Sequence, residues 1–323
     1  MSLDAEAIVD RRRLKRRISL WRLAAIVAVL VGVFAVFATL NEKDGLLGGR
    51  SHIAAVDIGG LITGSRSMTK TLKKIAKSSS AKALILRIDS PGGTTAGSEV
   101  LYEAIREVAD KKPVVAVLET VAASGGFIAA LGSDHIVARG NTITGSIGVI
   151  FQWAEVNQAL ASVGIKVEEI KSSPLKAAPS MFAETSPEAR AVTEAMVRDG
   201  YEWFVSLVAS RRPFDASTAR SLSDGRVYTG RQAVAARLID EIGGEKEAQS
   251  WLEKEKGLKS GLRIVDWSDN GVTDIDFVSK VINLAAKSLG LPGADKVVVG
   301  LSSIASKPRL DGLLSLWHPQ VLN

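Results

Sequence analysis

The chain has 323 residues, of which 46% are hydrophobic and none is cysteine, and its net charge is +6. This length allows one large domain or two smaller ones, each with a substantial core. The missing cysteines exclude disulfides, thiolate metal sites and a cysteine nucleophile.

The positive charge is concentrated at the N-terminus, where the first 22 residues hold seven Lys or Arg against three Asp or Glu. The remaining 34 basic and 32 acidic residues nearly cancel. The chain therefore lacks the basic surface that is typical of nucleic-acid-binding domains, and we expect no nucleic-acid partner.

Residues 23–40 form an uncharged apolar run. As a helix this run would be about 27 Å long, close to the hydrocarbon thickness of a bilayer. Trp21 and Arg22 lie where an interfacial aromatic residue and a cation belong. We predict a single transmembrane helix that leaves the basic tail, residues 1–22, in the cytoplasm and exports everything after residue 41.

The alternative for this region is a cleaved signal peptide, because residues 36–38 resemble a small-residue cleavage site. The apolar run is longer than the hydrophobic segment of most signal peptides, which favours a retained anchor. Either way, the domain that follows is expected outside the cytoplasm.

Residues 41–51, rich in glycine and charge, are predicted to be a linker to a domain that occupies residues 52–323. Short β-branched apolar runs within this domain are typical of buried strands, and helical spacing separates them. This alternation predicts an α/β fold of βαβ units with a parallel sheet covered by helices. The predicted strands are 53–58, 83–88, 114–118 and 135–138, and the predicted helices are 95–110 and, more weakly, 67–76.

The second half of the domain begins with a strand-like run at residues 165–168. Ser186, Pro187 and Glu188 supply a helix N-cap, a first-turn proline and an acidic first turn, which predicts a long helix to about Arg211. Short helices are expected over 215–244 and another helix over 245–256. An extension follows from about residue 258, and its sequence after residue 291 has no clear period.

Two glycine-rich segments follow predicted strands, where ligands of parallel sheets bind: DSPGG at 89–93 and ASGG at 123–126. Ser124, at the start of a helix and flanked by small residues, can present its hydroxyl to a cleft while the following amide groups point the same way. The turn at Pro91 can aim a second amide outward. The alternative is that Ser124 merely packs a helix against the sheet.

A serine nucleophile needs a base, and the chain has only three histidines: His52, His135 and His318. His135 lies within a predicted strand, where a packed or surface role is expected, so a Ser-His-Asp triad lacks a good candidate. A lysine can replace histidine when burial lowers its pKa. Lys176 lies in a loop without acidic neighbours, which singles it out among the lysines.

Five motifs occur in order, and together they resemble the signal peptide peptidases of serine peptidase family S49 in their short bacterial form. They are DSPGG at 89–93, AASGG at 122–126, TGSIGV at 144–149, IKSSPLK at 170–176, and VYTGRQA at 227–233 followed by LID at 238–240. The resemblance covers about residues 50–250.

The resemblance implies a Clp-protease-like, crotonase-type α/β fold with Ser124 as nucleophile and Lys176 as general base. Backbone amides near Gly93 and Gly125 would form the oxyanion hole. The segment 144–149 would be a strand that lines the cleft and pairs with an extended substrate, so its substrate-binding residues would be Gly145, Ser146, Ile147, Gly148 and Val149. No cofactor or metal is implied.

The chain departs from the family pattern at Ser173, where glycine is usual, and at Ala177, where an acidic residue often follows the lysine. These departures affect the expected loop geometry, and Lys171 is the alternative base. Each motif is present once, so Ser124 and Lys176 are expected to come from one repeat, as in the short members. Those members form ring- or dome-shaped homo-oligomers, and the resemblance implies such an assembly for this chain.

The expected function is therefore a Ser-Lys endopeptidase at the bacterial cytoplasmic membrane. It would degrade cleaved signal peptides and other apolar, extended peptides through an acyl-enzyme. Two alternatives remain: an acyl-CoA enzyme that uses the oxyanion donors without a nucleophile, and a non-catalytic membrane scaffold.

Overall fold

The computed structural model describes residues 51–267 and 314–316. The predicted basic tail, the predicted membrane span at 23–40, most of the linker and most of the C-terminal extension lie outside the described residues. Within the part of the chain that is described, no helix is both long enough and apolar enough to cross a bilayer.

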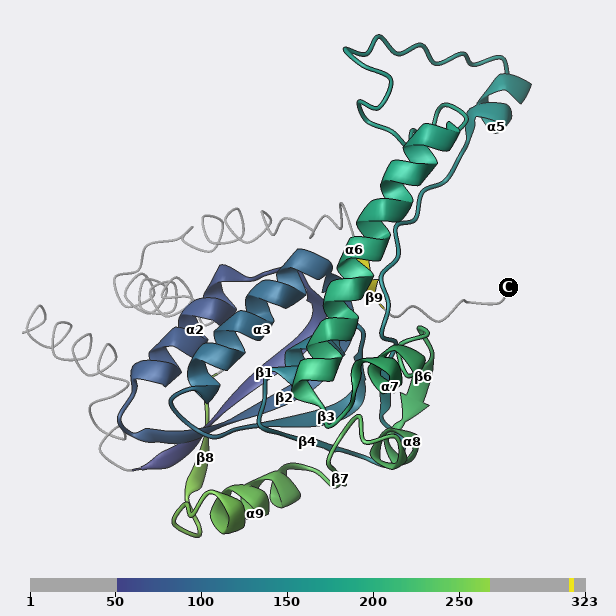
Figure 1. The fold of residues 1–323 in the computed structure, drawn as a ribbon. Coiled ribbons are helices and arrows are strands. Elements are labelled where there is room, and N and C mark those ends of the chain that lie inside the picture. The colour runs from purple at the N-terminus through teal and green to yellow at the C-terminus, as the bar shows by residue number, and fades with distance from the viewer. Residues whose placement is uncertain (1–50, 268–313, 317–323) are drawn as a thin grey trace, which may run out of the picture. The chain divides into compact units, whose positions relative to one another are not determined.

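One mixed sheet forms the centre of the domain (Figure 1). Its middle strands are parallel, as the alternation of strand and helix patterns predicted. The sheet order is β6-β5-β3-β2-β1-β8, while β4 pairs with β3 and β7, and β9 pairs with β2. The strands are β1 His52–Ile62, β2 Ala81–Thr94, β3 Val114–Ala123, β4 His135–Ala138, β5 Ile143–Gly145, β6 Val227–Thr229, β7 Glu241–Ile242, β8 Arg263–Asp266 and β9 Leu314–Leu316.

Helices cover both faces of this sheet because side chains of the central strands alternate between two apolar clusters. In β2, Leu84 and Leu86 belong to the larger cluster under α2, α3, α4 and α6, while Ile85 points to the opposite cluster under α9. The α/β class is thus confirmed. The helices are α2 Arg66–Lys77, α3 Thr95–Ala109, α4 Gly125–Leu131, α5 Asn157–Ser162, α6 Pro187–Arg211, α7 Ala216–Ser221, α8 Gly230–Ala235 and α9 Glu245–Glu255.

The predicted start of the long helix is confirmed in atomic detail. The Ser186 hydroxyl accepts a hydrogen bond from the Ala189 amide at 3.1 Å, and Pro187 opens α6. The short helices predicted over 215–244 are present as α7 and α8, and the strands β6 and β7, which were not predicted, also lie there. The strand-like run at 165–168 has no regular structure, since it lies away from the sheet edges that would complete its hydrogen bonds.

The second half of the domain sends an arm away from the sheet, which we define as residues 150–199 (Figure 1). It consists of the chain from residue 150 through α5 to the start of α6, together with the first half of α6. The helix is anchored in the domain by its second half, where Phe204 is fully buried and Val208 lies beside it in the core. The arm therefore depends on that buried half for its position.

We expect Phe204→Ala to lower the free energy of unfolding by about 3–5 kcal/mol, because it opens a cavity in the core where α6 packs against α4 and α7. Val100 on α3 is 42% exposed, so Val100→Ala should change stability by less than about 0.5 kcal/mol. Urea unfolding followed by circular dichroism measures both. Equal effects of the two substitutions would contradict this account of the anchor.

Candidate active site

Ser124 forms a strained turn between the end of β3 and the start of α4. Its backbone has φ 54° and ψ −115°, a region that residues with a side chain rarely adopt. The Ser124 amide donates to the Gly145 carbonyl at 2.8 Å, and the Ser124 carbonyl accepts the Ile128 amide at 2.9 Å. The residue is 1% exposed and its hydroxyl does not cap α4. The turn is thus held from both sides in the main chain.

The two glycine-rich segments lie side by side because β2 and β3 are neighbouring parallel strands, with Ser90 paired to Ala122. Gly93 and Gly125, the predicted oxyanion residues, are both buried. A Cβ on Gly93 would lie 1.9 Å from the Ile62 carbonyl oxygen. Only glycine fits at this approach of β1, so the structure brings the predicted oxyanion residues to the same end of the sheet as Ser124.

Asp89 is a site residue that the sequence reasoning missed. Between Ile88 and Ser90 the ladder to β3 shifts register, so Val121 has no opposite residue in β2 and pairs with Ile143 of β5. An Asp89 carboxylate oxygen accepts the Val121 amide at 3.0 Å. The signal was its place at the head of the DSPGG motif, and its carboxylate holds β3 three residues before Ser124.

The predicted substrate strand over 144–149 is only partly present. The strand β5 ends at Gly145, because Gly145 and Ser146 have φ of 80° and 50°, outside the extended region. A Cβ on Gly145 would lie 2.5 Å from the Tyr228 ring, which packs against this turn. Burial raises the pKa of the Tyr228 phenol, which donates to the Leu222 carbonyl at 3.1 Å.

The rest of that segment lines a groove of about 800 Å³ between residues 146–151 and the exposed side of α6. Residues 146–149 all line this groove, although Ile147 is fully buried and Val149 is only 8% exposed. Ser124 does not line this groove. The groove begins at Ser146. The residue before it, Gly145, accepts the hydrogen bond from the Ser124 amide.

A strand from the C-terminal part of the chain lies against the oxyanion segment. The backbone of β9 pairs antiparallel with Gly92–Thr94, with Gly93 opposite Ser315. This edge of the site therefore accepts an extended peptide main chain. The sequence had given no structure for this part of the extension.

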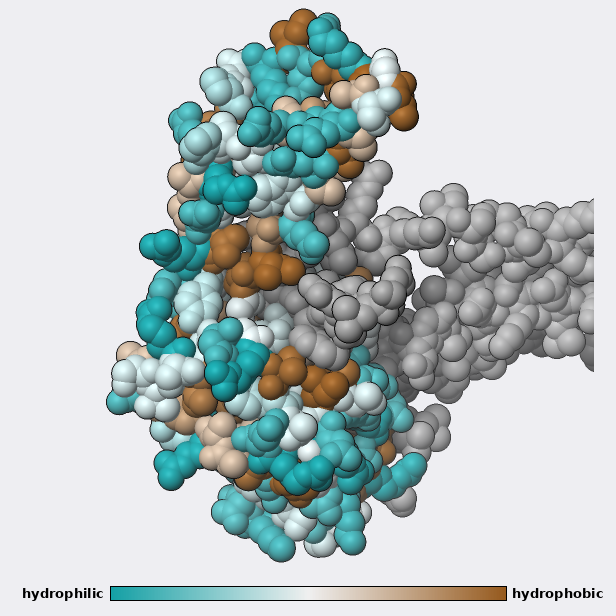
Figure 2. Space-filling view, turned by 90° about the vertical axis from the view of Figure 1, so that its right-hand side faces the viewer, coloured by the Kyte–Doolittle hydropathy of each residue, from teal (hydrophilic) through white to brown (hydrophobic). Residues whose placement is uncertain are grey.

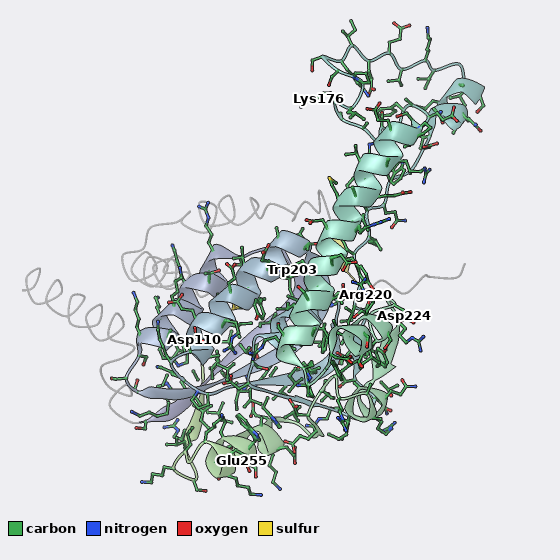
Figure 3. The ribbon with its side chains drawn as sticks, viewed as in Figure 1. Asp110, Lys176, Trp203, Arg220, Asp224 and Glu255 are labelled. Atoms are coloured by element: carbon green, nitrogen blue, oxygen red, sulfur yellow. The ribbon has the colours of Figure 1, made fainter. Side chains whose placement is uncertain are left out.

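The structure does not bring Lys176 to Ser124 within one chain. Figure 3 shows Lys176 at the far end of the arm, away from the sheet, whose strand β3 ends directly before Ser124. Its side chain is exposed, in a turn after the Ser173 carbonyl. The proximity expected from the motifs is thus absent inside a single copy.

Lys171, the alternative base, is engaged elsewhere on the arm. Its ammonium lies 2.5 Å from a Glu169 carboxylate oxygen. The hydrogen bond from Lys171 lowers the pKa of that carboxyl. No ion pair of Lys176 occurs among the described residues, so a carboxylate holds the ammonium of Lys171 but not that of Lys176.

Neither described histidine approaches Ser124. His135 pairs with Val115 near the amino end of β3, nine residues and roughly 30 Å of strand from Ser124. Its ring stacks on Trp251 at 4.5 Å. His52 accepts a hydrogen bond from the Trp267 indole at 3.1 Å and is 6% exposed. Both are packed, as expected for His135, and His318 lies outside the described residues.

Comparisons with known proteins place these residues in a family context. Residues 106–259 match the model of peptidase family S49. A protein of the cyanobacterium Synechocystis sp. named as a protease is 37% identical over 65% of this chain and 76% of its own. An Enterococcus faecium protein named as a signal peptide peptidase, SppA, is 37% identical over 58% of this chain and 55% of its own.

Among solved structures, a ClpP1 mutant from Listeria monocytogenes matches with a TM-score of 0.41 and 16% identity, over 60% of this chain and 92% of its own. The match of S49 includes Ser124 and Lys176 and both their surroundings. Gly93 and the rest of the DSPGG motif precede the matched range.

The contact between α4 and β2 yields a test of the site geometry. A Cβ on Gly126 would lie 2.6 Å from the Ser90 carbonyl oxygen, whereas a Cβ on Gly59 would meet nothing within 4 Å. We expect Gly126→Ala to lower the melting temperature and to slow labelling of Ser124 by a fluorophosphonate, because α4 must shift away from β2. Gly59→Ala should leave both unchanged. A labelling rate unaffected by Gly126→Ala would show that α4 can move without consequence.

Proposed function

The chain belongs to peptidase family S49 and is a serine peptidase, and on this basis we propose that it is a membrane-anchored endopeptidase with Ser124 as nucleophile and Lys176 as general base. The proposed fold within the α/β class is the Clp-protease-like, crotonase-type one. Family membership favours this function over an acyl-CoA enzyme or a scaffold.

The observation that carries the proposal is the strained turn at Ser124 between two glycine segments. A serine with positive φ at a strand-to-helix junction, held by its own amide and carbonyl, costs stability that a packing serine would not need. Gly93 and Gly125 are both buried at the ends of paired strands, and their backbone amides are the proposed donors of an oxyanion hole. The turn thus combines a fixed nucleophile with backbone donors.

The proposed reaction proceeds through an acyl-enzyme. The Ser124 Oγ attacks the substrate carbonyl carbon while its proton passes to Lys176 Nζ. The amides of Gly93 and Gly125 bind the negative oxygen of the tetrahedral intermediate. Lys176 then protonates the leaving amine as the C–N bond breaks, and a water deprotonated by the same lysine releases the acyl group from Ser124.

Because Lys176 lies at the end of the arm, we propose that it reaches Ser124 of a second copy. Figure 2 shows exposed hydrophobic residues, in brown, at the upper end of the molecule, where the arm lies. Ten of the 14 large apolar side chains that are exposed among the described residues belong to the arm. An apolar surface of this kind indicates a contact with another chain. They are Ile150, Val163, Ile165, Val167, Ile170, Leu175, Met181, Phe182, Val192 and Met196.

Arm-to-domain contact is heterologous, because the surface that binds differs from the surface that is bound. Such contacts close into a ring when the rotation between neighbours permits it. A ring or dome of identical chains, with each site completed by the neighbour's Lys176, is therefore the proposed assembly.

The proposed substrates are cleaved signal peptides and other apolar peptides in an extended conformation. The pairing of β9 with Gly92–Thr94 supports recognition of a peptide main chain beside β2. The groove lined by residues 146–151 supports recognition of peptide side chains. Gly145, Ser146, Ile147, Gly148 and Val149 are the proposed substrate-binding segment, although buried Ile147 contributes through its backbone alone.

The predicted helix at 23–40 would keep this site beside peptides released in the membrane. The proposed location is the bacterial cytoplasmic membrane, with the N-terminus in the cytoplasm and the peptidase domain outside. The chain itself provides both parts, since the basic tail and the apolar run directly precede the domain.

The dyad is tested by comparing two lysines of the same arm. We expect Ser124→Ala and Lys176→Met each to reduce kcat for an apolar fluorogenic peptide by at least about 10³-fold. Lys171→Met should keep kcat within about threefold, because that lysine serves an ion pair. Substantial hydrolysis by Lys176→Met, or its loss in Lys171→Met, would contradict the assignment of the base.

Mixing the inactive variants tests whether the lysine comes from a neighbour. Ser124→Ala chains and Lys176→Met chains, unfolded or dissociated together and reassembled one to one, should regain about a quarter of the wild-type rate, because random neighbours complete that share of the sites. A dyad within one chain would leave the mixture as inactive as its components.

The anchor is tested in cells that express the full chain. Membranes washed with alkaline carbonate should retain the protein, and protease added to spheroplasts should remove the domain but not a tag at Met1. A soluble protein whose mass lacks the first residues up to about Ala38 would establish the cleaved signal peptide instead.

A further inference from the structure

Ser90 is a fully buried polar residue at the point where β2 meets the oxyanion segment. It is 0% exposed. Its Oγ donates to the Gly60 carbonyl at 2.6 Å and accepts the Gly92 amide at 3.1 Å. The hydroxyl thus bridges β1 and the turn that carries Gly93, and neither family membership nor the proposed dyad gives it a role.

The bridge replaces a strand hydrogen bond that Pro91 cannot make. The ladder between β1 and β2 runs from Gly59 opposite Asp89 to Leu61 opposite Gly92, so β2 has one extra residue at this point. Pro91 stands in that bulge without an N–H. The Ser90 hydroxyl supplies the missing donor to Gly60 and at the same time turns the buried Gly92 amide inward.

The main chain of Ser90 also faces the nucleophile. Ser90 pairs with Ala122, two residues before Ser124. Its carbonyl oxygen is the atom on which Gly126 of α4 packs, since a Cβ there would approach it to 2.6 Å. One residue therefore contacts the turn of Gly93 through its side chain and the helix of Gly125 through its backbone.

We propose that Ser90 is a positioning residue that sets the Gly93 amide relative to Ser124 and Gly125, so that both donors meet the same oxyanion. This inference rests on the proposed function. Without the hydroxyl, the Gly92 amide is buried and unpaired, a cost that the turn relieves by rotating its peptide groups. Rotation at residues 92 and 93 moves the Gly93 amide while Ser124 stays in place.

The test separates positioning from general stability by a matched pair of buried serines. Ser133 is 4% exposed, and its hydroxyl lies within hydrogen-bond distance of the Ala130 and His135 carbonyls at 2.7 and 3.0 Å. Ser90→Ala and Ser133→Ala each remove one buried hydroxyl. We expect similar falls in melting temperature, but a kcat about 10- to 100-fold lower in Ser90→Ala alone, somewhat less than deletion of a whole oxyanion donor causes.

The KM of Ser90→Ala for the same peptide should stay within about twofold, because the oxyanion forms only after binding. Ser90→Thr restores the hydroxyl but adds a methyl group to a filled site. It should therefore be less stable than wild type while keeping kcat within about fivefold. Labelling of Ser124 by a fluorophosphonate, whose P–O group occupies the oxyanion site, should follow kcat across these variants.

The proposal is overturned if Ser90→Ala matches Ser133→Ala in kcat and labelling, if only KM changes, or if kcat of all three variants simply follows melting temperature. Ser124→Ala distinguishes this failure from that of the proposed function. Hydrolysis that survives Ser124→Ala defeats the nucleophile assignment, whereas hydrolysis that depends on Ser124 but not on Ser90 defeats the positioning role alone.

Discussion

The parallel pairing of β2 with β3 is the constraint on which the site depends. With Ser90 opposite Ala122, the carboxyl ends of two neighbouring strands place the turn of Gly93 beside the turn of Ser124. Parallel strands need a crossover between them, and α3 supplies it from Thr95 to Ala109. The two halves of the proposed oxyanion hole are thus fixed by the ladder, and the loops need only supply backbone amides.

Side chains complete this ladder where its register breaks. Asp89 accepts the Val121 amide, and Ser90 donates to the Gly60 carbonyl in place of Pro91. The buried Gly92 amide would cost about 1–3 kcal/mol without the Ser90 hydroxyl that it donates to. These two side chains therefore stabilise an irregular pair of strand ends. At these strand ends Gly93 lies against the Ile62 carbonyl and Gly126 lies against the Ser90 carbonyl, so neither position has room for a side chain.

The arm separates the two proposed catalytic side chains. A helix of 25 residues, Pro187–Arg211, is buried in its second half and extends its first half away from the domain. In the proposed assembly, the geometry that separates Lys176 from its own Ser124 presents this lysine, with an apolar surface, to a neighbouring copy. Activity and assembly would then be one property, because a single chain holds both groups but not one complete site.

The sequence by itself determined the strands at 53–58 and 83–88, the capped start of α6 and the α/β class, because these follow from local apolar periodicity and from helix-capping residues such as Ser186. It also indicated Ser124 as a candidate nucleophile, because the residues on either side of it are small. Only the tertiary structure decided that β5 stops at Gly145, that Ser90 bridges to β1, and that Lys176 lies far from Ser124. Register, bulges and the direction of a long helix depend on contacts between segments distant in sequence, which no local pattern records.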